Sequence, residues 1–137
     1  MSARTFIDSN VLLYAIDDED PIKRTVSRTV LRQLMESQNG VVSTQVLQEF
    51  AAVATRKFGI SPTQAKAALR SWAALDTVLL TTGVIYDAID EMTLSRLSFW
   101  DSLIIAAAAS AHCTELLTED LQPGQTIRGV TVHNPFA

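Results

Sequence analysis

The sequence contains 137 residues, of which 47% are hydrophobic and 19% are charged, and its formal net charge is −4. This composition is typical of one ordered globular domain, here residues 1–137, and excludes an intrinsically disordered chain. The negative charge excludes a protein whose whole surface is basic, although a local group of basic residues remains compatible with nucleic-acid binding.

The chain has a single cysteine, Cys113, which rules out an internal disulfide and is typical of a reducing compartment. The N-terminus lacks the basic, apolar and small-residue pattern of a signal peptide. The most apolar window, residues 102–112, is shorter than the ~20 residues that a membrane helix needs. We therefore expect a cytoplasmic protein without a membrane segment.

The first half of the chain alternates between predicted strands and helices. Apolar residues recur at helical spacing in the two longer segments, and "QNG" ends the first of them. In chain order we predict a strand over 4–8, a helix or turn over 11–16, a helix over about 22–37, a strand over 41–43 and a helix over 44–58.

The second half continues the alternation. Ser61, Pro62 and Gln64 form the sequence signature of a capping box and predict a helix start. We predict helices over 62–74, 84–94 and 99–112 (the last capped by Ser98), strands over 77–80 and 115–118, and a short edge strand over 129–133. Strands that alternate with helices predict an α/β layered fold with a mainly parallel sheet.

Two acidic residues directly follow predicted strands. Asp8 lies at the end of the first strand, and Asp120 lies just past the strand over 115–118. The carboxyl ends of parallel strands are where α/β sheets bind ligands. A turn-forming aspartate is the simpler interpretation of Asp120, and its neighbour Glu119 is an alternative for the same role.

Two further acids lie on predicted helices. Glu49 borders the apolar stripe of its helix, where a charge at the rim is the simpler interpretation when it is considered alone. Asp101 precedes Ile104 and Ile105 by three and four residues, so it lies on the apolar face. A favourable interaction with the helix dipole explains its place in the first turn but not its inward direction. We therefore favour a functional role for Asp101.

A group of four carboxylates needs protons or a cation to offset the repulsion between like charges. Oxygen ligands without a Cys/His set select Mg²⁺ or Mn²⁺ over zinc. Such sites hydrolyse phosphodiesters, because the metal makes hydroxide available and offsets charge on the phosphate.

Five segments, in this order, resemble the PIN-domain family and, more narrowly, the VapC-type toxin ribonucleases of bacterial toxin–antitoxin pairs. They are "FIDSNVLLYA", "STQVLQEF", "FWDSLIIAAA", "LLTEDLQPGQ" and "GVTVHNPF", and the resemblance extends over essentially the whole chain. It implies a Rossmann-like, three-layer PIN fold and endonucleolytic cleavage of RNA with Mg²⁺ or Mn²⁺. It also implies a cognate antitoxin that blocks the site, and a homodimer.

The resemblance also assigns roles to individual residues. The acidic quartet around the metal consists of Asp8, Glu49, Asp101 and Asp120, of which Asp8 and Asp101 are expected to contact Mg²⁺ most directly. Asn10 is expected to orient Asp8, and Thr118 to bind metal-linked water.

Basic and aromatic residues supply further candidates. Arg24, Arg28 and Arg32 recur every four residues on one predicted helix, with Lys23 beside them. This stripe predicts either contact with RNA or antitoxin, or an ordinary solvated helix face. We expect Trp100 to fill the core or a subunit interface, and stacking on an RNA base is the less favoured alternative.

Two other functions are compatible with the sequence. A Mg²⁺-dependent phosphatase of Rossmann-like fold normally has a nucleophilic aspartate in a "DxD" pair, whereas residue 10 here is asparagine. A non-catalytic module that binds antitoxin or RNA would keep the acids only as a docking surface.

Overall fold

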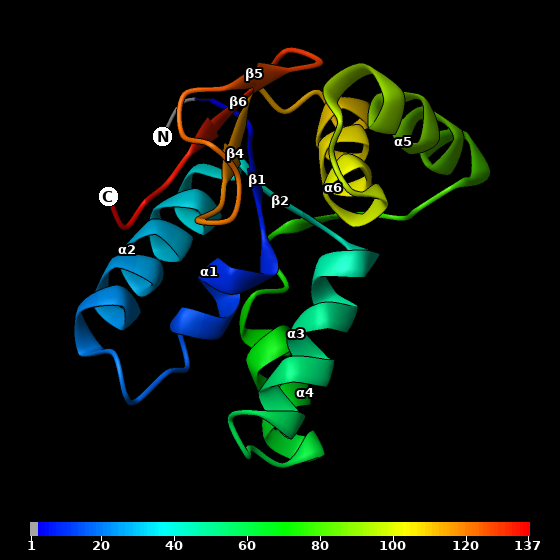
Figure 1. Ribbon diagram of the computed structural model, residues 1–137. Coiled ribbons are helices and arrows are strands. Elements are labelled where there is room, and N and C mark those ends of the chain that lie inside the picture. Colours follow the sequence, from blue (N-terminus) through cyan, green and yellow to red (C-terminus); the bar gives the residue numbers. More distant parts are fainter. Residues whose placement is uncertain (1–2) are drawn as a thin grey trace.

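The computed structural model describes residues 3–137, which fold around a six-stranded sheet of order β3-β2-β1-β4-β6-β5 (Figure 1). The strands are β1 (Thr5–Ile7), β2 (Gly40–Ser43), β3 (Asp76–Val78), β4 (Glu115–Leu117), β5 (Thr126–Ile127) and β6 (Val130–His133). All neighbouring pairs are parallel except β5 with β6. The predicted α/β fold with a mainly parallel sheet is therefore confirmed.

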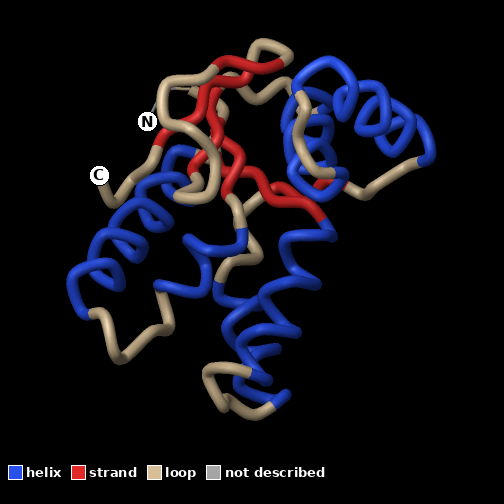
Figure 2. The backbone as a smooth tube through the Cα atoms, viewed as in Figure 1, coloured by secondary structure: helices blue, strands red, loops and turns tan. Residues whose placement is uncertain are grey.

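Helices surround the sheet. They are α1 (Ser9–Tyr14), α2 (Pro21–Ser37), α3 (Thr44–Arg56), α4 (Pro62–Ser71), α5 (Thr82–Ser95) and α6 (Phe99–Ser110). Figure 1 shows α2 on one side of the strands and α6 with α5 on the other. In the same view, Figure 2 shows α1, α3 and α4 below the strands, where β1 and β2 end. Within residues 3–137, no helix has the length and apolar character needed to cross a membrane.

Polar side chains fix the points where the helices begin. Ser43, Thr81 and Ser98 each accept a hydrogen bond from the backbone N–H three residues later, at the starts of α3, α5 and α6. At α4, Gln64 N donates to Ser61 Oγ (3.1 Å) and Ser61 N donates to Gln64 Oε1 (2.8 Å). The predicted capping box is therefore confirmed.

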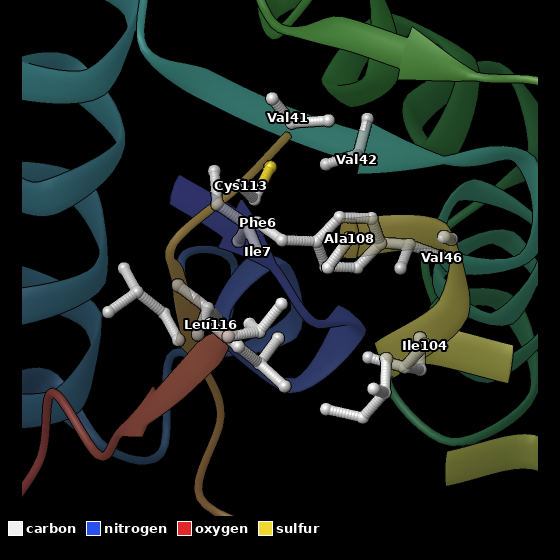
Figure 3. Packing of buried hydrophobic residues seen from close by; sticks show 14 of the residues in the cluster. Phe6, Ile7, Val41, Val42, Val46, Ile104, Ala108, Cys113 and Leu116 are labelled. Carbon is white, nitrogen blue, oxygen red and sulfur yellow. The ribbon is translucent and has the colours of Figure 1, made fainter. Parts of the chain in front are cut away.

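The core lies on both faces of β1. Its residues are fully buried, and successive side chains point to opposite faces. Figure 3 shows the Phe6 ring pointing from β1 toward Ala108 of α6, near Val46 of α3 and Ile104. The alanines of α6 allow that helix to lie close to the sheet. Burial of one such aromatic side chain contributes about 1.5–3 kcal/mol.

The strand order places the functional edge of the sheet. The chain proceeds outward from β1 to β2 and β3, and then returns across β1 to add β4 and β6. The carboxyl ends of β1 and β4 therefore flank the point where the strand order reverses, which is the ligand-binding crevice in open parallel sheets. Asp8 follows β1 here, and residues 118–120 follow β4.

Two predictions from the sequence are wrong in detail. The strand over 129–133 is not an edge strand, because β6 lies between β4 and the two-residue β5. Arg128 and Gly129 have φ values of 50° and 76° and form the tight turn between β5 and β6. Of the two places expected for Trp100, the core is wrong, since the residue is 65% exposed, and a subunit interface stays a prediction. Trp72 packs edge-on against Phe50.

Gly40, at the start of β2, provides a test of the packing between the sheet and α2. A Cβ atom here would overlap Leu75 Cδ2 and lie 3.1 Å from Leu34 Cβ. We expect Gly40→Ala to lower the free energy of unfolding by about 1–3 kcal/mol, measured by chemical denaturation. Gly83→Ala is the matched control, because Gly83 is helical and has room for a methyl group. Equal stability of the two variants would contradict this account of the core.

Candidate metal centre

Asp8 is held in place by its own backbone and by α1. Its N–H donates to Leu117 O of β4 (3.0 Å), which continues the pairing of the two strands. Its Oδ1 accepts the Ser9 N–H (2.7 Å), so Asp8 is also the N-cap of α1. The residue is only 8% exposed. The carboxylate is therefore fixed in orientation at the end of β1 and largely withdrawn from water.

The Thr118 hydroxyl connects three of the predicted site residues. Thr118 is fully buried, and its Oγ1 donates to Asp8 Oδ2 (2.9 Å). The same oxygen accepts hydrogen bonds from Asn10 Nδ2 and from Asp120 N, both at 3.1 Å. Asn10 Nδ2 also lies 3.1 Å from Asp120 Oδ2. Asn10 therefore contacts Thr118 and Asp120, and it reaches Asp8 through Thr118.

The two helix-borne acids face the same edge of the sheet. Asp101 lies in the first turn of α6, where its N–H donates to Ser98 Oγ (3.1 Å). Glu49 lies on α3 and is partly buried. The charge of Glu49 interacts with those of Asp8, Asp101 and Asp120, and the charge of Asp8 interacts with those of Asp120 and Asp101. The four predicted acids thus lie near enough for the charges of Asp101 and Asp120 to act on both Asp8 and Glu49, although they are far apart in sequence.

Glu119 does not belong to this group, because its side chain contacts Tyr14 and Lys23 instead. The basic stripe is also partly engaged within the chain. Arg24 Nη1 pairs with Asp18 Oδ1 (2.8 Å), and Arg28 Nε donates to Ala15 O (2.7 Å), while Arg32 is exposed.

Burial and like charges perturb the acids. Burial, assisted by the charges of Asp120 and Asp101, raises the pKa of Asp8 to about 6, against the lowering effect of its bonds to Ser9 and Thr118. Burial is also the main cause of the raised pKa of Glu49, followed by the charge of Asp8. Near neutral pH the group therefore carries repulsion that a divalent cation would relieve.

The residues fit a hydrated hard cation better than a closed cage of protein ligands. Among residues 3–137, no three acidic, histidine or cysteine side chains form a ready-made ligand set. However, Glu49 Oε1 and Asn10 Oδ1 are buried oxygens without a hydrogen-bond partner, an uncommon and costly state. Mg²⁺ keeps several waters and binds through one or two carboxylates, which agrees with both observations.

Gln45 is a site residue that the sequence did not reveal. It lies on α3 one turn before Glu49 and is 5% exposed. Its Nε2 lies 3.3 Å from Trp100 O, and its hydrogen bond to Glu49 lowers the pKa of that acid. Gln45 therefore joins α3, which carries Glu49, to the start of α6, which carries Asp101. Its only sequence signal is a polar residue on the buried face, four positions before an acid.

The chain belongs to the PIN domain family, because the profile of that family matches residues 5–125. No curated protein matches the sequence.

Solved structures of related fold include three from toxin–antitoxin systems. A toxin–antitoxin complex from Klebsiella pneumoniae aligns with a TM-score of 0.72 at 17% identity, over 96% of this chain and 97% of that chain. VapC20 of Mycobacterium tuberculosis, described as a toxin that cleaves the sarcin–ricin loop, aligns with a TM-score of 0.64 at 17% identity (82% and 86% of the chains). VapBC2 of Rickettsia felis, bound to a fragment of its promoter DNA, aligns with a TM-score of 0.61 at 20% identity (85% and 87%).

The raised pKa of Asp8 predicts that the free energy of unfolding of the metal-free protein depends on pH. The folded state keeps this proton up to about pH 6, whereas the unfolded chain releases it near pH 3.8. The resulting stabilisation is present below pH 3.8 and is lost as the pH rises to 6, by roughly 3 kcal/mol at most. We therefore expect Asp8→Asn to gain stability relative to the parent between pH 4 and pH 7.

Denaturant titrations of both proteins in EDTA would measure this difference. Asp18→Asn is the control, because the Asp18 side chain is 92% exposed. Saturating Mg²⁺ at pH 7 is expected to narrow the gap, since the cation stabilises only the parent carboxylate. A gap between Asp8→Asn and the parent that is the same at pH 4 and pH 7 would contradict the buried-acid account.

Proposed function

We propose that this PIN-domain protein is a Mg²⁺-dependent endoribonuclease (with Mn²⁺ as an alternative cofactor) and the toxin of a toxin–antitoxin pair. The observation that carries the proposal is the convergence of Asp8, Glu49, Asp101 and Asp120 at the point where the strand order reverses. Two of these carboxylates, Asp8 and Glu49, have raised pKa values, and perturbed acids that gather at such a strand edge are typical of a reactive site. The absence of a thiolate or imidazole in this set favours a hard cation over zinc.

In this mechanism the protein supplies orientation and a proton acceptor. A bound divalent cation would lower the pKa of water and offset the charge on the scissile phosphate. Asp8, Asp101 and Asp120 would hold the ion, with Asp8 kept in place by Ser9 N–H and Thr118 Oγ1. Glu49 has a raised pKa and an unpartnered Oε1, so this oxygen would accept the proton of the attacking water.

The proposed partners follow from the structural relatives. The Klebsiella complex contains an antitoxin and aligns over nearly all of both chains, and VapC20 cleaves RNA. We accordingly propose an RNA substrate and a cognate antitoxin. The proposed homodimer rests on the resemblance of the sequence to the VapC-type toxins, and the proposed cytoplasmic location rests on the single cysteine and the N-terminal sequence. Arg24 and Arg28 have partners within the chain, so Arg32 is the member of the basic stripe best placed to contact RNA or antitoxin.

We expect Asp8→Asn and Asp101→Asn each to reduce RNA cleavage at least about 100-fold, because each removes a charge that holds the cation. The measurement is the rate of new 5′ ends in total cellular RNA incubated with partner-free protein, with Mg²⁺ or with EDTA. Circular dichroism would verify that the variants fold.

Asp18→Asn is again the matched control and should cleave as the parent does. If either the Asp8 or the Asp101 variant cleaves RNA at the parental rate, the proposal is wrong. A parent protein that binds antitoxin but cleaves no RNA with either Mg²⁺ or Mn²⁺ would favour the non-catalytic module. Phosphate trapped on Asp8 would favour the phosphatase.

A further inference from the structure

Glu119 directly precedes Asp120 but points to a different set of partners. Its Oε1 accepts a hydrogen bond from Tyr14 OH (2.6 Å), and its Oε2 accepts one from Lys23 Nζ (3.0 Å). Lys23 Nζ also donates to Tyr14 OH (3.2 Å), which closes a triangle of three polar groups. Both Glu119 oxygens are therefore engaged away from the metal centre.

Aromatic rings enclose this triangle. Lys23 Nζ lies 4.5 Å from the centroid of the Tyr14 ring and 5.3 Å from that of Phe136. The two rings meet edge-to-face at 4.9 Å. We call Tyr14, Lys23, Glu119 and Phe136 the clamp. It joins the end of α1, the first turn of α2, the segment after β4 and the C-terminal segment, so one cation holds four parts of the chain together.

The clamp acts at the start of an irregular segment whose far end is held by β6, through the hydrogen bonds from Gly124 N to Val132 O and from Val132 N to Gln125 O, both 2.8 Å. Residues 119–125 form no helix or strand, and Asp120 is exposed. Asp120 is held by Asn10 and Thr118, and the preceding residue is held by Lys23 and Tyr14. Two consecutive residues are thus each hydrogen-bonded to α1, through Asn10 and Tyr14, which restricts the backbone between them.

We propose that the clamp positions Asp120 for metal binding, with Lys23, Tyr14 and Glu119 acting as positioning residues. Glu119 contributes through the turn and does not itself bind the metal. This inference rests on the proposed function to the extent that Asp120 is a metal-holding acid. Metal affinity and RNA cleavage are separate measurements, so the two proposals can fail independently.

Glu119 is paired within the clamp, because both of its carboxylate oxygens contact Tyr14 or Lys23. The pairing with Glu119, with help from Tyr14, raises the pKa of Lys23 to about 12, so Lys23 keeps its charge across the working pH range. Loss of the clamp should therefore change where the Asp120 carboxylate lies. This displacement should lower the affinity for the metal ion and leave the KM for RNA unchanged.

The experiment uses the full chain and three substitutions in the clamp: Glu119→Gln, Lys23→Met and Tyr14→Phe. Mn²⁺ binding is measured without RNA by electron paramagnetic resonance, and the Mg²⁺ dependence of cleavage is measured separately. We expect Glu119→Gln and Lys23→Met to weaken Mn²⁺ binding about 10-fold, as loss of support for a ligand does. Tyr14→Phe keeps the ring, so it should have a smaller effect.

Three comparisons distinguish positioning from a general loss of stability. Lys23→Arg retains the cation and should restore most of the affinity, while the double variant Lys23→Met/Glu119→Gln should be no weaker than either single one. Arg24→Gln is the matched control, because Arg24 follows Lys23 on α2 and its loss breaks only an ion pair with Asp18. This variant should leave Mn²⁺ binding unchanged. The melting temperature is recorded for every variant.

Clamp variants that melt earlier but bind Mn²⁺ as the parent does would overturn the proposal and make the clamp a structural brace. If the parent cleaves RNA and the clamp variants bind Mn²⁺ as tightly as the parent, the clamp proposal is overturned and the proposed nuclease function stands. A parent that binds Mn²⁺ without cleaving RNA would remove the proposed function, and the affinity series would still decide the role of the clamp. A parent that binds no Mn²⁺ would overturn both.

Discussion

The hydrogen bond from Thr118 Oγ1 to Asp8 Oδ2 is the contact on which the centre depends. It spans the ends of β1 and β4, the two strands between which the chain reverses its order in the sheet. Because Thr118 Oγ1 also accepts bonds from Asn10 and from the Asp120 backbone, one buried hydroxyl sets the positions of three polar residues. Its sheet position is fixed in turn by the bond from Thr118 N to His133 O of β6.

The same arrangement makes the ionised forms of Asp8 and Glu49 unfavourable. Asp8 lies among apolar residues and other acids, so its ionised form lacks the solvation it has in water. Glu49 adds to the repulsion from α3. A protein that selected only for stability would not gather these charges. Their convergence at a ligand-binding edge is therefore better explained by the cation and phosphate chemistry that they would support.

Local patterns in the sequence contain much of the fold and part of the site. The capping box at Ser61 and the helical spacing of apolar residues depend on neighbours within one or two turns, and both appear as predicted. The partner of Gln45 is 55 residues away in the sequence, and the two partners of Glu119 are 105 and 96 residues away. The spacing of neighbouring residues does not reveal such distant contacts. The position of the very short β5 outside β6 is likewise determined by the sheet as a whole. The exposure of Trp100 reflects which face of α6 the sheet covers, and hydrophobicity alone does not separate a core position from one at a subunit interface.

That exposure gives the molecule a built-in optical probe. Trp100 directly precedes Asp101, its carbonyl oxygen is the one that Gln45 contacts, and its exposed indole packs edge-on against Phe99. The chain has two tryptophans, and Trp72 is partly buried and packs against Phe50 on α3. Their emission should differ in wavelength because indole fluorescence follows the polarity of its surroundings. Replacement of Trp72 by phenylalanine would leave one tryptophan, in the residue next to Asp101, whose emission follows changes at the start of α6 without a chemical label.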